Sequence, residues 1–359
     1  MTTSTLQSGK TPEQPTLRSS RVRRWLGHLF HEWTIESWRP IAPAFAKPTP
    51  ATWSDAQVTF AWLGHATVLI NFFGIKILTD PALFPRVGIR LPGFTIGPKR
   101  LTAPALKVDE LPKTDLILLS HAHFDHLDLR TLRCFDENTS VITARGTSDL
   151  LRRTRFREVT ELDWGETKRV KTASGEIDVI AFRVNHWGAR KQRDTYRGYN
   201  GYLLESRERA RHRIIFAGDT AMTDSFAELR QHGEIAEPGP AGQRLQFSPT
   251  AASVDVTGRS WATQPVGATG CPSGAKRVDV AIMPIGAYNP WIHAHCSPEQ
   301  AVEMANAAAA RFIMPVHHQT FRLSFEPFRE PIERFEAALG KTPERIALRE
   351  IGETFVLPL

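Results

Sequence analysis

Residues 121–126 carry the side chains of this chain that are best suited to chemistry. They read His-Ala-His-Phe-Asp-His, so three imidazoles and one carboxylate lie within six positions. Imidazole and carboxylate are zinc ligands, and the spacing gives two pairs, His121 with His123 and Asp125 with His126. Two pairs this close suit two adjacent metal ions better than one. The sequence therefore predicts a dinuclear metal centre; two Zn²⁺ are expected, with other divalent ions left open.

The elements on either side of this motif must position it. Residues 115–120 form a short apolar run, the pattern of a buried strand, and a helix is expected over 125–135. A turn between a strand and a helix is where sites form in open α/β sheets. Strands and helices elsewhere are mixed without strict alternation, which predicts a layered α/β sandwich.

Three further ligand candidates each follow an apolar run that reads as a strand. They are His186 after 179–184, Asp219 after 214–217 and His317 after 312–316. A single histidine after a strand is more often structural, so any one of these alone would be weak. Four ligand-bearing turns at the same end of four strands would meet at one edge of the sheets. Their shared position therefore favours one common site.

The whole chain has the composition of an ordinary globular protein. It has 359 residues, 41% hydrophobic and 23% charged, and no uninterrupted apolar stretch long enough to span a membrane. Its three cysteines are odd in number and form no Cys-x-x-Cys pair, which favours a reducing compartment. We therefore expect a cytoplasmic protein.

The N-terminal part differs in composition from the rest. Residues 1–18 are rich in Thr, Ser, Gln and Pro and are expected to be disordered, and 19–50 form an amphipathic basic segment followed by a proline-rich linker. Apolar residues over 22–33 have helical spacing, with arginines on the other face. This pattern is typical of a helix lying on a membrane, so 19–38 could contact anionic lipid on the inner membrane face; packing on the main domain is the alternative.

The main domain is expected over 51–359. Residues 233–277 interrupt it with a Gly-, Pro-, Ser- and Thr-rich stretch that shows little periodicity. We interpret this stretch as a flexible insertion, either a plain loop or a lid over the site.

From about residue 58 onward, apart from that insertion, the sequence resembles the metallo-β-lactamase superfamily. Within it, the chain is similar to the branch of N-acylphosphatidylethanolamine-hydrolysing phospholipase D and its bacterial relatives. The matching motifs are residues 62–67, 79–81, 121–128, 185–187, 218–220, 284–290 and 317–321. The resemblance implies an αββα sandwich with a two-metal site at one edge.

The resemblance also implies a ligand set. His121, His123 and His186 would hold one ion, Asp125, His126 and His317 would hold the other, and Asp219 would bridge them. The family has an aromatic residue where this chain has His318, which leaves the choice between His317 and His318 slightly open. The match of Thr320-Phe321 favours His317.

Five other residues are candidates for supporting roles. Asp80 would orient a ligand imidazole, or would be a turn residue before a proline. His295, at a family position near the site, would be a general acid or a phosphate ligand, or a surface loop histidine. His65 is a weaker candidate of the same kind. Tyr288 and Trp291 would line the substrate pocket, although loop aromatics are as often there for packing.

The resemblance predicts a phosphodiesterase of phospholipase D type, with Asp125, Asp219 and His295 acting in catalysis. Its substrate would be a phospholipid or a small phosphodiester. A lactonase of the ascorbate-6-phosphate type is the alternative; a nuclease or a non-catalytic metal-binding protein is less favoured. β-Lactam hydrolysis is disfavoured because common β-lactamases have Cys where this chain has Asp219. No nucleic-acid partner is expected, since the basic excess lies outside the core, and the oligomeric state is open.

Overall fold

The computed structural model describes residues 36, 38–191, 193–207, 212–230 and 277–358. The predicted disorder over 1–18, the helix over 22–33 and nearly all of the insertion over 233–277 lie outside the described residues. The chain divides into two units, Met1–Pro40 and Ile41–Leu359. Within the first unit, Arg39 donates a hydrogen bond of 2.6 Å to Glu36. The second unit holds every element described below.

The first sheet has seven strands in the order β15-β1-β2-β3-β6-β7-β8. β1, β2 and β3 form an antiparallel meander, and β3, β6, β7 and β8 continue it as parallel neighbours. Consequently β1 points the same way as β3 and β6. The bounds are β1 Val58–Gly64, β2 Thr67–Phe72, β3 Ile75–Thr79, β6 Leu116–Leu119, β7 Ser140–Ala144, β8 Val159–Leu162 and β15 Thr354–Val356.

The second sheet has six strands in the order β14-β13-β12-β11-β10-β9. β9 to β12 are antiparallel, whereas β12, β13 and β14 run parallel. Therefore β10, β12, β13 and β14 end at one edge. The bounds are β9 Thr167–Thr172, β10 Gly175–Phe182, β11 Gly201–Ser206, β12 Arg213–Phe216, β13 Val278–Pro284 and β14 Ala310–Val316.

The two sheets bury a common hydrophobic core between them. Phe60 and Trp62 of the first sheet and Tyr202 and Phe216 of the second are completely buried in this cluster. Strand alternation sorts the second sheet's residues between two layers. Val280 and Ile282 of β13 join the core between the sheets, while Ala281 and Met283 belong to a second cluster shared with the helices.

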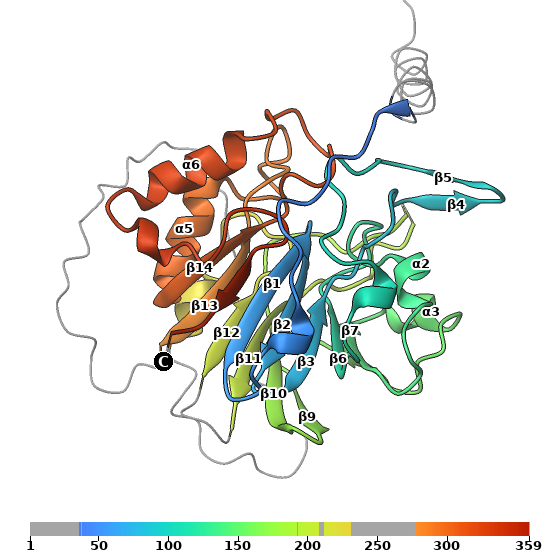
Figure 1. The fold of residues 1–359 in the computed structure, drawn as a ribbon, viewed down its shortest axis with the longest axis horizontal. Helices are drawn as coiled ribbons and strands as arrows, with labels where there is room; N and C mark the ends of the chain where they lie inside the picture. The colour runs from blue at the N-terminus through green and yellow to red at the C-terminus, as the bar shows by residue number, and fades with distance from the viewer. Residues whose placement is uncertain (1–35, 37, 192, 208–211, 231–276, 359) are drawn as a thin grey trace, which may run out of the picture. The chain divides into compact units, whose positions relative to one another are not determined.

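Helices cover the outer face of the second sheet (Figure 1). α5 (Pro298–Ala307), α6 (Glu330–Leu339) and α4 (Ser225–Glu228) contribute buried residues such as Phe226, Met304 and Phe335 to the second cluster. α5 begins as the sequence indicates, with a capping box between Ser297 and Gln300. At the first sheet lie α2 (Leu129–Leu132) and α3 (Ser148–Leu151), of which α3 contacts β8. The predicted αββα sandwich is therefore confirmed.

The structure differs from the sequence-based expectation in two places. The helix expected over 125–135 is a single turn, Leu129–Leu132, because Asp128 caps it and accepts hydrogen bonds from the backbone N–H groups of Arg130 and Thr131. Residues 41–50, expected as a linker before the main domain, are part of the main unit, and the backbone N–H of Ala46 donates a hydrogen bond to the Ile351 carbonyl.

The sequence also gave no indication of the hairpin formed by β4 (Ile89–Leu91) and β5 (Phe94–Ile96). Short 3₁₀ turns at Pro50–Thr52 (η2), Val108–Glu110 (η3) and Pro343–Arg345 (η4) complete the described elements. None of the helices within the described ranges combines the length and the apolar character needed to cross a bilayer.

Candidate metal centre

The ligand candidates all follow strands whose carboxyl ends share one edge of the sandwich. From the first sheet come His65 after β1, Asp80 after β3 and the 121–126 motif after β6. From the second sheet come His186 after β10, Asp219 after β12 and His317 after β14. The structure thus brings the seven predicted ligands to one place.

The backbone is unusual at several of these turns. His65, Asp80 and His317 have φ angles of 54°, 32° and 65°, in the left-handed region that residues with a Cβ rarely adopt. Such conformations cluster at functional sites, where the surrounding structure imposes them. Gly218 has a φ of 61°, and a Cβ there would lie 2.6 Å from the Ser120 Cβ. Glycine is therefore required beside Asp219.

One group of donors consists of His121, His123, His186 and Asp219. The Nδ1 atom of His123 lies 2.8 Å from Nε2 of His121 and 3.3 Å from Nε2 of His186. The Asp219 Oδ2 atom lies 3.9 Å from both of those Nε2 atoms. The ligand atoms of this group all lie within 4.8 Å of one another, which is close enough for them to share one ion.

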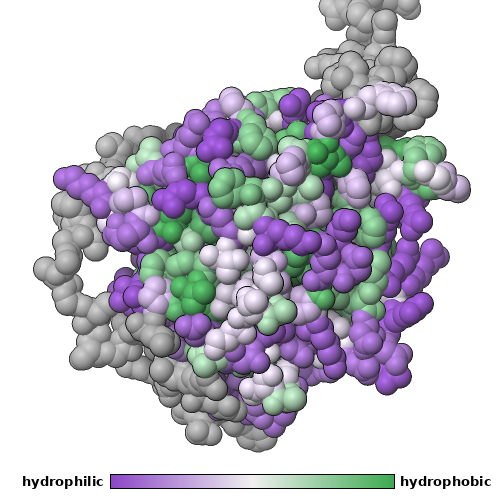
Figure 2. Space-filling model, in the orientation of Figure 1, coloured by the Kyte–Doolittle hydropathy of each residue, from purple (hydrophilic) through white to green (hydrophobic). Residues whose placement is uncertain are grey.

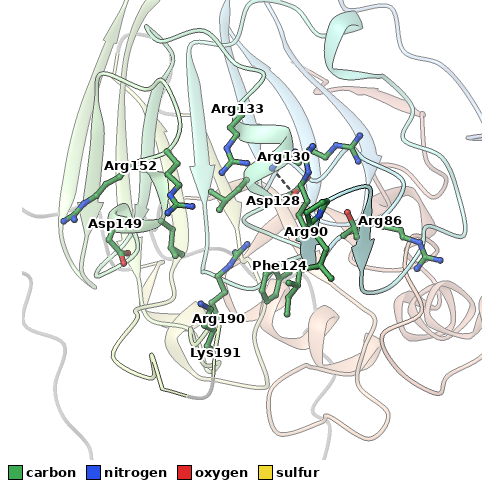
Figure 3. Close-up of a pocket in the computed structure, with 18 of the residues that line it drawn as sticks. Arg86, Arg90, Phe124, Asp128, Arg130, Arg133, Asp149, Arg152, Arg190 and Lys191 are labelled. Atoms are coloured by element: carbon green, nitrogen blue, oxygen red, sulfur yellow. Dashed lines mark hydrogen bonds between the residues drawn. The ribbon is translucent and has the colours of Figure 1, made fainter. Parts of the chain in front are cut away.

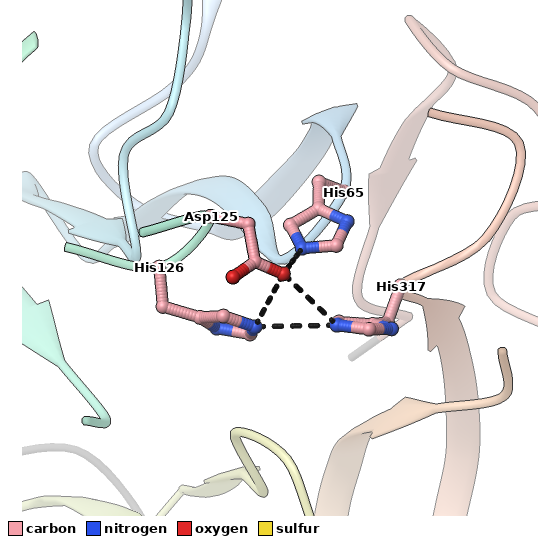
Figure 4. A group of neighbouring side chains, drawn as sticks. All are labelled: His65, Asp125, His126 and His317. Atoms are coloured by element: carbon pink, nitrogen blue, oxygen red, sulfur yellow. Dashed lines mark hydrogen bonds and ion pairs between the residues drawn. The ribbon is translucent and has the colours of Figure 1, made fainter. Parts of the chain in front are cut away.

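A second group contains Asp125, His126 and His317, together with His65 (Figure 4). The Nε2 atoms of His126 and His317 lie 3.2 Å apart, and Asp125 Oδ2 lies 3.5 Å and 3.8 Å from them. Asp219 Oδ2 also reaches this group, at 3.0 Å from His126 Nε2 and 3.2 Å from His317 Nε2. Asp219 is therefore shared by the two groups.

The second nitrogen of three imidazoles is fixed by a hydrogen bond. His126 Nδ1 lies 2.6 Å from Asp80 Oδ2, His121 Nδ1 lies 2.8 Å from Ser120 Oγ, and His186 Nδ1 lies 2.7 Å from the Ala294 carbonyl. Because the carbonyl can only accept, as does Asp80 in its ionised form, we assign protons of His126 and His186 to Nδ1. Ser120 Oγ donates to Asp80 Oδ2 at 2.5 Å, so its lone pair is available to His121 Nδ1–H. All three Nε2 lone pairs then point into the cluster.

The electrostatics of the cluster suit a bound cation. Burial lowers the pKa of His121 well below its usual value and that of His186 to about 3, so both rings are neutral ligands. Burial alone would raise the pKa of Asp219, but the charge of His126 and then of His317 outweighs it and holds this pKa well below the usual range. Asp219 Oδ1 and His123 Nε2 are buried without a hydrogen-bond partner among the described residues. Burial alone would lower the pKa of His126 and His317, but the nearby carboxylates, Asp219 first, outweigh it and raise the pKa of His126 well above its usual value and that of His317 to about 9. A bound cation would take the place of the protons on these two rings. Neutral His121 and His186, ionised Asp219 and its unpartnered Oδ1 together fit divalent metal ions.

The remaining predicted residues occupy different surroundings. His295 Nδ1 lies 3.8 Å from Asp219 Oδ2 and is buried with no hydrogen-bond partner in the described part of the chain, which places this residue at the cluster and not on the surface. His65 Nε2 lies 2.9 Å from Asp125 Oδ2. The Tyr288 hydroxyl lies 2.7 Å from Glu330 of α6, and Trp291 is 56% exposed. The lining roles of these two aromatics stay predictions.

His317 and His318 point to different parts of the molecule. His317 lies within the cluster, whereas the ring of His318 packs against Trp62 with a centroid distance of 4.6 Å. The geometry thus selects His317 as the candidate ligand.

Two residues next to the cluster were missed by the sequence reasoning. Trp187 is 55% exposed, and its ring lies 4.9 Å from that of His123. Its position directly after His186 is a signal that could have identified it. Arg190 donates hydrogen bonds of 2.8 Å to the carbonyls of Ala122 and Leu127, and thereby holds the loop that carries the 121–126 motif. No local pattern marks that arginine.

Comparison with known proteins supports the same family. The family model described as a beta-lactamase superfamily domain matches residues 76–236. An uncharacterised protein of Mycobacterium tuberculosis is 28% identical over 320 residues, which cover 86% of this chain and 71% of that protein. A mitochondrial N-acyl-phosphatidylethanolamine-hydrolyzing phospholipase D of Saccharomyces cerevisiae is 30% identical over 84% of this chain, but the match spans only 56% of the yeast protein. A Caenorhabditis elegans phospholipase D of the same description is 27% identical over 79% of this chain and 70% of its own length.

Solved structures show the same fold. A metallo hydrolase from the archaeon Ignicoccus hospitalis superimposes with a TM-score of 0.53 at 17% identity, over 84% of this chain and 99% of that protein. At this identity the similarity shows the fold alone. Fold, donor cluster and sequence relatives agree, and the chain belongs to the metallo-β-lactamase superfamily of metal-dependent hydrolases.

Proposed function

We propose that this protein is a phosphodiesterase of phospholipase D type that uses two Zn²⁺ and acts on N-acylphosphatidylethanolamine-like lipids. The observation that carries the proposal is the position of Asp219, whose Oδ2 lies 3.0 Å from His126 Nε2 and 3.9 Å from His121 Nε2. One carboxylate shared by two donor groups suits a pair of adjacent ions. Two relatives named for this lipid activity support the choice of substrate.

In this proposal the ligands divide as the distances group them. His121, His123 and His186 hold one ion, Asp125, His126 and His317 hold the other, and Asp219 contacts both. A pair of divalent ions lowers the pKa of a bound water to near neutrality and stabilises charge on phosphoryl oxygens.

The protein's own residues supply orientation and proton transfer. Asp80 keeps the His126 ring in place through its 2.6 Å contact with Nδ1. His295, with an unpartnered Nδ1 at the edge of the cluster, is positioned to contact the phosphate or to pass a proton to the leaving alkoxide. Such a group contributes about 10²–10⁴-fold in related reactions.

A substrate panel tests the proposed reaction. The full chain, loaded with Zn²⁺, is incubated with N-acylphosphatidylethanolamine, a lactone, a thioester and a β-lactam. We expect the lipid to give phosphatidate and N-acylethanolamine, with the other substrates turned over more slowly. Faster hydrolysis of the lactone than of the lipid would contradict the phospholipase assignment and favour a lactonase.

A matched pair of variants tests the shared carboxylate. Asp219→Asn should lower kcat/KM by roughly a hundredfold or more, because it removes a charge from both metal sites. Asp224→Asn changes an exposed aspartate five positions further along the chain and should leave kcat/KM unchanged. Metal analysis should find two ions per chain in the unaltered protein and fewer in Asp219→Asn. Equal metal content in the two variants would contradict the shared ligand.

A further inference from the structure

The hairpin of β4 and β5 presents a partly exposed apolar face. In its antiparallel register Ile89 is opposite Ile96, and Leu91 is opposite Phe94. Because side chains alternate along a strand, these four share one face, and Arg90 and Thr95 share the other. Ile89 and Phe94 are 55% and 51% exposed, and Leu91 and Ile96 are each 37% exposed. A projecting ribbon with four exposed apolar side chains on one face indicates an interaction surface.

The hairpin also borders a strongly basic pocket, whose lining includes Ile89 and Leu91 of the apolar face as well as Arg90 and Thr95 (Figure 3). The pocket has a volume of about 920 Å³, and its lining includes eight Arg or Lys residues but only two Asp. Arginines from the hairpin, from α2 and from the end of α3 contribute, among them Arg90, Arg133 and Arg153. In the space-filling view, apolar side chains at the hairpin lie next to a hydrophilic strip of the surface (Figure 2).

The positive charge of the pocket is not neutralised from within it. Asp128 caps α2 through the backbone N–H groups of Arg130 and Thr131, and Asp149 pairs with Arg197, which is outside the lining. Within the described residues, Arg90, Arg133 and Arg153 have no ion-pair partner closer than 4 Å. The pocket therefore attracts anionic groups from outside the protein.

The pocket adjoins the metal-binding loop. Phe124, between two ligand candidates, is part of its lining, and Arg190 stacks on the Phe124 ring at 3.9 Å. A surface that binds here consequently lies against the loop that carries the 121–126 motif.

We propose that the apolar hairpin face and the basic pocket together form a docking surface for an anionic lipid bilayer. Apolar side chains enter the boundary between headgroups and acyl chains, while arginines bind lipid phosphates. The combination of apolar and basic groups selects a bilayer, because a soluble anion would leave the apolar face in water. This inference goes beyond the proposed function, since docking does not require the bound lipid to be the substrate.

Vesicle flotation with the full chain tests the docking surface. The vesicles are pure phosphatidylcholine, or phosphatidylcholine mixed with phosphatidylglycerol. The apolar variant is Leu91→Ser with Phe94→Ser, and its control is Val356→Ser, an exposed apolar residue of β15. The charge variant is Arg90→Gln with Arg153→Gln, and its control is Lys113→Gln with Lys341→Gln, which removes the same charge from exposed positions away from the pocket.

The unaltered protein should bind the mixed vesicles and bind pure phosphatidylcholine more weakly. Each docking variant should bind the mixed vesicles about tenfold more weakly, since each basic residue and each buried apolar side chain contributes to membrane partitioning. Both controls should bind like the unaltered protein, and thermal melting should show that all variants are folded. The proposal is overturned if the unaltered protein stays in solution, or if the docking variants bind no more weakly than their controls.

A soluble substrate separates this proposal from the proposed function. Hydrolysis of bis(4-nitrophenyl) phosphate should be the same in the docking variants and the unaltered protein, because these variants leave the metal ligands intact. Normal hydrolysis with undiminished vesicle binding by the variants would overturn the docking surface alone. Weakened binding by the variants, with no phosphodiester hydrolysed by any of the proteins, would overturn the proposed function alone.

Discussion

The direction in which each imidazole offers its lone pair depends on the partner of its other nitrogen. The Nδ1 atoms of three ligand candidates are hydrogen-bonded to Asp80, Ser120 and the Ala294 carbonyl, so their three Nε2 atoms face the cluster. Asp80 does more than this, because it also accepts from the Ser120 hydroxyl and backbone N–H. A single carboxylate thus orients ligands of both donor groups.

Replacing Asp80 by asparagine should weaken metal binding without removing a ligand. We expect metal affinity to fall about 10–100-fold, the usual cost of losing such a supporting carboxylate. Isothermal titration calorimetry with Zn²⁺ measures this affinity. Asp55→Asn, an exposed aspartate paired with Lys76, is the control and should bind metal normally. Unchanged affinity in Asp80→Asn would mean that the 2.6 Å contact with His126 does not orient the ligand.

The neighbouring histidines 317 and 318 should respond in opposite ways to the same substitution. His317→Phe should lose metal, because it removes a donor atom that lies 3.2 Å from Asp219 Oδ2. His318→Phe should keep its metal and change the free energy of unfolding little, since the ring of His318 packs against Trp62 outside the cluster and a phenyl ring has a similar volume. Metal analysis and urea unfolding measure the two effects. Metal loss in His318→Phe would contradict the assignment of His317.

At the scale of the elements, the sequence predicts the site better than it predicts the boundaries. Apolar runs before His121, His186, Asp219 and His317 identify β6, β10, β12 and β14, because a buried strand is a continuous apolar run. Because those strands run in the same direction within each sheet, their carboxyl ends lie at the same edge. Spacing alone did not say with which ion each ligand outside the 121–126 motif belongs. The resemblance to a known family supplied that grouping.

The elements that escaped prediction have physical reasons to do so. β4, β5 and β15 have three residues each, too few for a periodic signal, and β9 reads Thr-Lys-Arg-Val-Lys-Thr with one buried residue. The helix expected after the motif shortens to one turn, because local spacing does not reveal that the Asp128 cap lies three residues past Asp125. The role of Arg190 depends on carbonyls more than 60 positions away along the chain, which no local pattern encodes.

A glycine pair tests how tightly the turn after β12 is constrained. Gly218→Ala should destabilise the fold by roughly 2 kcal/mol or more and reduce metal content, since it combines a left-handed backbone with a clash at Ser120. Gly93→Ala is the control: its φ is also positive, at 84°, but no atom lies within 4 Å of the added Cβ. Gly93→Ala should therefore cost only about 1 kcal/mol. Equal unfolding free energies for the two variants would show that the contact with Ser120 does not matter.

For the molecule as a whole, the donor cluster lies where the two sheets meet. His121, His123, Asp125 and His126 come from the first sheet, and His186, Asp219 and His317 come from the second. An ion held by both sets links the two halves of the sandwich directly. Metal binding and folding stability should consequently be coupled.

Removal of metal by a chelator should therefore lower the melting temperature. A ligand present at about a thousand times its Kd stabilises the folded state by about 4 kcal/mol, so a decrease of several degrees is expected for a domain of this size. Calorimetry with and without chelator measures it, and added Zn²⁺ should restore the original value. In the Asp219→Asn variant, the chelator should lower the melting temperature by less than in the unaltered protein. A melting temperature insensitive to chelator would contradict the link between the sheets.

The division of ligands between the sheets also bears on how the protein is made. During synthesis the 121–126 motif leaves the ribosome nearly two hundred residues before His317, with only part of each donor set. The nascent chain can assemble the first donor set once Asp219 has emerged, but the second set stays incomplete until β14 has emerged and paired with β13. Completion of the two-ion centre is thus a late event in biogenesis, and polypeptides released prematurely before β14 would be unable to complete it.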